Sequence, residues 1–114
     1  VLCALVLCSV DDPAGVVAEL RRVLTDDGVL LVMEHVLASP GSRTARVQQR
    51  LDGGWAAMAG GCHLTRTTVR TLSEGGFDTS RIRELGAPKV FPLLPLVAGA
   101  AGVSSEPAGR AARA

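Results

Sequence analysis

Two apolar runs, residues 1–10 and 29–36, flank a single amphipathic helix at the start of the chain. The runs are largely continuous rather than alternating, which is typical of strands buried on both faces of a sheet. Asp12 and Pro13 begin the helix between them, with the aspartate as N-cap and the proline in the first turn. Strand, helix and strand in succession predict a βαβ unit with parallel strands and a right-handed crossover, and therefore an α/β fold.

Two more helices are expected after this unit. Ser42 is placed to cap a helix that begins at Arg43, in which the glycines at 53 and 54 predict a break or kink. Thr65 is the expected N-cap of the next helix, which the glycines at 75 and 76 end. Strands are then expected at residues 81–86 and 93–101, and residues 103–114 are expected to form a disordered tail.

Composition excludes several classes of function. A chain of 114 residues can bury one small core, and its twelve basic and eleven acidic residues nearly cancel, which argues against a nucleic-acid partner. No apolar run reaches the roughly 18–20 residues of a transmembrane segment. The three cysteines, Cys3, Cys8 and Cys62, are an odd set without a C-x-x-C pair, which indicates a reducing, cytoplasmic setting and predicts no metal site.

The chain opens directly inside an apolar run, without an initiator methionine. Natural domains seldom begin in the middle of a strand. We therefore expect this chain to be a fragment of a domain whose N-terminal half is missing, and that half would be its partner in folding.

The ends of the two parallel strands are the candidate ligand site, because ligands bind outside the carboxyl ends of strands in open parallel sheets. The first strand ends near Leu7, Cys8 and Ser9, and the second ends at Glu34 and His35. Charged residues on a buried strand are costly, so Glu34 and His35 need an explanation. They either border a ligand cleft, or Glu34 caps a helix or pairs with an arginine while His35 is half-exposed.

Five segments carry a resemblance to a known family: LVLCSV at 5–10, LRRVL at 20–24, MEHV at 33–36, QRLDGGW at 49–55 and GCHLTR at 61–66. The first three resemble the second half of a class I S-adenosylmethionine-dependent methyltransferase, in the quinone-biosynthesis-like group. The last two, together with MEHV, resemble its alkyl-thiol methyltransferase subgroup. The resemblance covers about residues 1–102.

This resemblance implies a Rossmann-like sheet of seven strands, of which this chain supplies the fourth to the seventh. The last strand, at 93–101, would run antiparallel, inserted between the strands at 29–36 and 81–86. The glycine-rich cofactor loop of the family would lie in the missing half, and no G-x-G-x-G pattern occurs here. The implied reaction is methyl transfer from S-adenosylmethionine to a small-molecule acceptor, a thiol or similar nucleophile.

The resemblance also assigns candidate residues. Leu7, Cys8 and Ser9 match the segment beside the methionine end of the cofactor. Glu34 and His35 match the acceptor side, where His35 is the first choice to accept the acceptor's proton.

Cys62 and His63 match a connection that covers the acceptor pocket, as does Arg66, and His63 is the second choice for the proton. These residues are equally consistent with ordinary turn and helix-cap positions.

Two other functions remain open from the sequence. A βαβ unit also occurs in dinucleotide-dependent oxidoreductases, which an all-parallel sheet would favour. The chain is also consistent with a non-catalytic remnant that packs on a partner through its exposed strand edge. In every case the isolated fragment is expected to be inactive, because it lacks the cofactor's glycine-rich motif.

Overall fold

The computed structural model describes residues 1–39, 41–87 and 94–104. The elements run in the order β1 (Leu2–Ala4), α1 (Pro13–Val23), β2 (Val29–His35), α2 (Arg43–Met58), α3 (Thr68–Glu74), β3 (Phe77–Asp78), β4 (Ile82–Gly86) and β5 (Leu96–Val103). The predicted disordered tail lies outside the described residues from 105 onward. None of the helices in the described ranges is long and apolar enough to cross a membrane.

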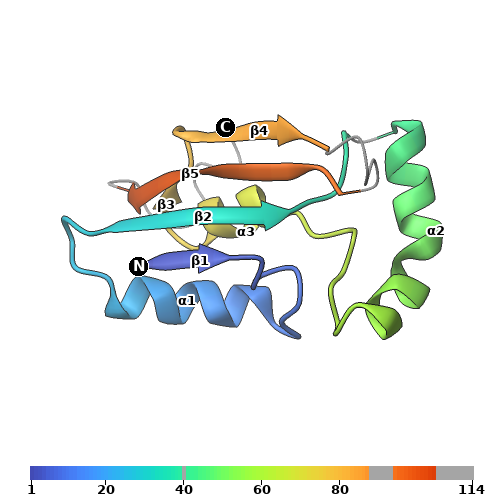
Figure 1. Cartoon of the computed structure of the whole chain (residues 1–114). Coiled ribbons are helices and arrows are strands. Elements are labelled where there is room, and N and C mark those ends of the chain that lie inside the picture. The colour runs from blue at the N-terminus through green and yellow to red at the C-terminus, as the bar shows by residue number, and fades with distance from the viewer. Residues whose placement is uncertain (40, 88–93, 105–114) are drawn as a thin grey trace.

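The five strands form one mixed sheet in the order β1, β2, β5, β3, with β4 also paired to β5 (Figure 1). β1 and β2 are parallel, as the βαβ pattern predicts. β5 is antiparallel to β2 on one side and to β4 on the other. This confirms the insertion of an antiparallel last strand, and it favours the methyltransferase arrangement over the all-parallel sheet of the oxidoreductase alternative.

The strands beside β5 can approach it closely because β5 consists mostly of small residues. A Cβ on Gly99 would collide with the main chain of Arg81 and Ile82 on β4. Glycine at this position is therefore required by the close approach of two backbones rather than by a turn.

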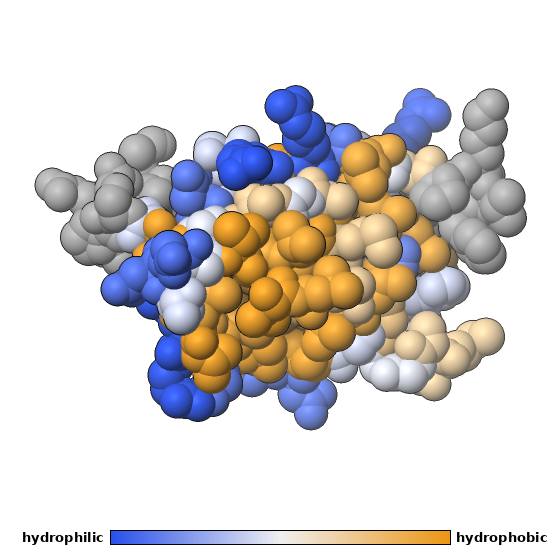
Figure 2. All heavy atoms as spheres, turned by 60° about the vertical axis from the view of Figure 1, so that its left-hand side comes forward, coloured by the Kyte–Doolittle hydropathy of each residue, from blue (hydrophilic) through white to orange (hydrophobic). Residues whose placement is uncertain are grey.

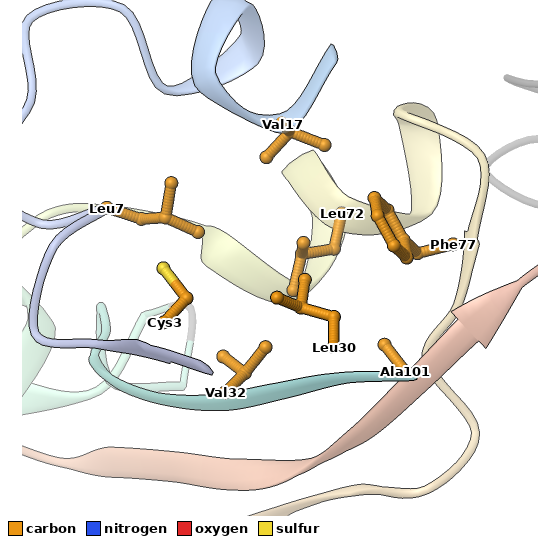
Figure 3. Packing of buried hydrophobic residues seen from close by; sticks show 8 residues of the cluster. All are labelled: Cys3, Leu7, Val17, Leu30, Val32, Leu72, Phe77 and Ala101. Atoms are coloured by element: carbon orange, nitrogen blue, oxygen red, sulfur yellow. The ribbon is translucent and has the colours of Figure 1, made fainter. Parts of the chain in front are cut away.

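The core lies between one face of the sheet and the helices α1 and α3. Leu30 and Val32 of β2 point to that face, where they pack with Val17 of α1 and with Leu72 and Phe77 (Figure 3). All five are at most 3% exposed. The alternate residues of β2 point to the opposite face and stay exposed, as its burial pattern shows.

Two of the three predicted helix caps are confirmed. The Asp12 side chain accepts a hydrogen bond from the Gly15 amide, with Pro13 in the first turn of α1. The Ser42 side chain accepts one from the Ala45 amide at the start of α2. Such bonds satisfy amide groups that the helix itself leaves without partners.

Three predictions of local structure are wrong, and one short strand was missed. The first strand ends at Ala4 instead of continuing toward residue 10, because the chain turns at Leu5, whose φ is +55°. α2 is unbroken at glycines 53 and 54. α3 begins at Thr68 with Thr67 as its N-cap, two residues after the predicted cap. The short strand β3 was not expected from the sequence.

Candidate active site

The site is built around the loop that follows β1, residues 5–10, which lies at the carboxyl end of that strand. Leu7 and Cys8 are each 1% exposed, whereas Ser9 is half-buried. In this conformation Ser9 is therefore the one residue of the three that offers an accessible group to a ligand. Burial raises the pKa of the Cys8 thiol to about 11, so it is protonated at neutral pH and unsuited to act as a nucleophile.

Glu34 lies beneath this loop, near the end of β2, and is fully buried. Its Oε1 accepts hydrogen bonds from the Val6 amide at 3.0 Å and the Leu7 amide at 3.1 Å. The Cys3 thiol donates to the same oxygen at 3.4 Å. Burial, and next the nearby Glu34 charge, raise the pKa of Cys3 to about 12. This geometry favours a role beneath the loop over the direct acceptor contact expected from the sequence.

His35 points to the opposite face of the sheet, because side chains alternate along a strand. It is half-buried, and its Nδ1 is buried without a hydrogen-bond partner in the described ranges. Burial lowers the pKa of His35, and the nearby Glu34 opposes this only in part. The imidazole is therefore neutral near pH 7 and able to accept a proton. The side chains of Glu34 and His35 therefore face opposite sides of the sheet.

The connection between α2 and α3 closes over the loop. The His63 amide donates to the Cys8 carbonyl at 2.7 Å, and Arg66 Nη2 donates to the Val10 carbonyl at 2.6 Å. Cys62 and Cys8 are both buried, and the nearby Cys62 thiol contributes to the raised pKa of Cys8. The structure thus brings Cys62 and His63 next to the predicted cofactor residues.

Asp52 of α2 holds this connection in place, a role that sequence reasoning missed. Its Oδ2 lies 2.9 Å from Nδ1 of His63, and its Oδ1 accepts the Leu64 amide at 2.5 Å. Burial raises the pKa of Asp52, but the hydrogen bonds from His63 and from backbone amides outweigh it and leave the pKa below its ordinary value. Asp52 stands in the QRLDGGW segment, which is the only sequence signal that could have singled it out.

A cavity of about 700 Å³ opens beyond the end of β2, next to the connection. Val36, Leu37, Arg66 and Thr68 are among the residues that line it. Thr68 is 2% exposed, and its hydroxyl has no hydrogen-bond partner in the described part of the chain. The volume falls in the range of small-molecule pockets. Within the described ranges, no three histidine, cysteine or acidic side chains come together as they would in a metal site.

Comparison with known proteins agrees with this architecture. The family model described as "Methyltransferase domain" matches residues 1–32. Thiol S-methyltransferase TMT1B of Rattus norvegicus is 37% identical over 102 residues, which are 89% of this chain and 42% of that protein. The TMT1B of Homo sapiens is 39% identical over the same share of each chain. Human thiol S-methyltransferase TMT1A is 35% identical over 94 residues, 82% of this chain and 38% of that protein.

Fold, site and matches together show that the chain is related to the class I methyltransferases and carries part of their Rossmann-like sheet. Within that family its similarity is to thiol S-methyltransferases. The chain spans about two fifths of the length of these curated relatives, 42% in the case of rat TMT1B.

Proposed function

We propose that residues 1–102 form the C-terminal part of an S-adenosylmethionine-dependent methyltransferase domain, and that the acceptor is a small thiol. The observation that carries the proposal is the similarity over 102 residues to proteins named thiol S-methyltransferases. The antiparallel β5 beside β2 supports it, because it matches the sheet expected for this family. The three free, buried cysteines support a reducing compartment, the cytoplasm.

The loop after β1 fits the cofactor in its chemistry. S-adenosylmethionine supplies a methyl group already activated on a cationic sulfonium, so no covalent enzyme intermediate is needed. The buried Glu34 carboxyl beneath the loop suits a cation above it, and Ser9 offers a half-buried hydroxyl. In this proposal the loop formed by Leu7, Cys8 and Ser9 holds the cofactor, with Ser9 as the residue in direct contact.

The acceptor side needs alignment, exclusion of water and a place for one proton. The connection that carries Cys62 and His63 covers the loop, whereas His35 does not line the adjacent cavity and faces the other side of the sheet from Glu34. A thiol with a pKa of about 8.5 is largely protonated at neutral pH, so a neutral imidazole helps by taking its proton. His35 is the proposed acceptor of that proton, with His63 as the second candidate.

The role of His35 can be tested in a chimera in which the aligned residues of this chain replace the matching segment of rat TMT1B. His35→Ala should lower kcat for an alkyl thiol about tenfold, at the low end for general bases because thiols ionise readily. The dissociation constant of S-adenosylmethionine should stay within a few-fold of the parent value. His63→Ala is the matched comparison, with a smaller expected loss of kcat.

Calorimetry measures the cofactor constant and circular dichroism checks the fold. Loss of cofactor binding by folded His35→Ala would show that the two sides of the cleft are assigned the wrong way round.

A further inference from the structure

We propose that Glu34 is the positioning residue of the loop after β1, and that it sets the main-chain conformation in which residues 7–9 meet the cofactor. The placement of the loop by Glu34 stands on the structure alone. Its consequence for the cofactor rests on the proposed function.

The loop needs hydrogen-bond partners outside the strand ladder because it leaves the sheet soon after Ala4. The last bond to β2 comes from the Leu5 amide, which donates to the Met33 carbonyl at 2.8 Å. Leu5 itself has φ +55°, in the left-handed region that residues other than glycine seldom occupy. From there the chain turns inward, and the amides of Val6 and Leu7 point away from the strand ladder.

Glu34 supplies the acceptor that both amides then require. Buried amides without a partner are strongly unfavourable, and one carboxyl oxygen, Oε1, receives both. The two donors lie 28 and 27 residues away in sequence, so the bonds fix the loop to a neighbouring strand rather than to itself.

The anchored segment leads directly into the candidate cofactor residues. Leu7 donates its own amide to Glu34, and Cys8 is tied on its other side through its carbonyl to the His63 amide. The main chain at residues 7 and 8 is therefore held from below by β2 and from above by the connection. Removing the lower support should alter the geometry that a cofactor meets without removing any group that touches it.

Two substitutions distinguish the hydrogen-bonding role of the Glu34 carboxyl from the volume that its side chain fills. Glu34→Met has nearly the same length and leaves no large cavity, but it cannot accept a hydrogen bond. Glu34→Gln keeps one carbonyl oxygen to receive the two amides. Glu74→Met and Glu74→Gln are matched controls, because Glu74 lies on the exposed side of α3 and pairs only with Arg70 among the described residues.

The rat TMT1B chimera allows two measurements well below the unfolding temperature. The first is amide hydrogen exchange at Val6 and Leu7 without cofactor, and the second is the dissociation constant of S-adenosylmethionine. Glu34→Met should speed hydrogen exchange at the Val6 and Leu7 amides about tenfold and raise the dissociation constant of S-adenosylmethionine about tenfold. The KM for the thiol should change less than about twofold. Glu34→Gln should recover most of both losses, and the Glu74 variants should match the parent.

Each result bears on a distinct part of the proposal. Unchanged exchange at Val6 and Leu7 in folded Glu34→Met would overturn the anchoring role. Faster exchange with unchanged cofactor affinity would overturn the positioning role and leave Glu34 as a structural residue. A parent chimera that fails to bind S-adenosylmethionine would overturn the proposed function itself. If Glu34→Met does not fold, Glu34→Asp replaces it, with an acceptor that is one methylene too short and an expected intermediate loss of both properties.

Discussion

The isolated chain is expected to self-associate through one face of its sheet. Val29, Leu31 and Met33 of β2 point to this face and are 38–51% exposed, and Leu2 of β1 beside them is 72% exposed. Figure 2 shows apolar side chains gathered over one side of the molecule. Large exposed apolar patches drive association, and a formal net charge of +1 offers little repulsion against it.

β1 strengthens the same expectation. It pairs with β2 alone among the described strands, so its other side presents unpaired backbone groups. No charged residue or proline interrupts residues 1–10 to protect that edge.

Sedimentation velocity measures the association, and two matched variants locate it. Leu31→Lys should shift the chain to a monomer, because a lysine can lie along the sheet while its charge blocks apolar contact. Leu51→Lys, at a similarly exposed leucine on α2, should leave the association unchanged. A monomeric parent chain, or dissociation by Leu51→Lys alone, would contradict the assignment of this face.

Phe77→Ala is expected to unfold most of the chain. Phe77 is 2% exposed and packs with Leu72 and Leu30 in the hydrophobic core (Figure 3). Truncation of a buried phenylalanine costs about 3–5 kcal/mol, which is comparable to the whole stability of many small domains.

Urea unfolding followed by circular dichroism, in the Leu31→Lys background to keep the chain monomeric, measures this loss. Val23→Ala is the control, because Val23 is 53% exposed and should change stability by less than about 0.5 kcal/mol. A loss below 1 kcal/mol for Phe77→Ala would show that the core is centred elsewhere.

The βαβ unit and the helix caps at Asp12 and Ser42 could be predicted because their signals are local. Aspartate or serine at an N-cap bonds an amide within three residues of itself. An apolar run of strand length is recognised from its own residues alone. The antiparallel placement of β5 came from the family resemblance, since small residues such as Gly99 and Ala101 carry no signal of strand direction.

The end of the first strand could not be predicted because apolar residues can be buried either in a strand or in a loop. Residues 5–10 are apolar, yet Leu7 and Cys8 are buried in a loop, held by a carboxyl from β2 and by the connection before α3. Hydrophobic pattern alone does not separate a buried strand from a buried loop. The role of Glu34 follows from the same contacts and is invisible without them.

α2 shows tertiary contacts that override local propensity. Glycines 53 and 54 predict a break or kink, but the helix continues through them, and two side chains fasten it just before this segment. Gln48 accepts the Ala38 amide at 2.8 Å, and Asp52 binds His63 and Leu64. These bonds fix the part of α2 that leads into the glycines, and they also position the connection over the candidate cofactor loop.

Methyl transfer by the rat TMT1B chimera tests the central claim most directly. The chimera is incubated with methyl-labelled S-adenosylmethionine and, in parallel, with an alkyl thiol or the alcohol of the same carbon skeleton, and the products are identified by mass spectrometry. The account predicts label in the thioether, little or none in the ether, and a lower rate with His35→Ala. A chimera that binds S-adenosylmethionine but methylates the alcohol as fast as the thiol, or neither of them, would contradict it.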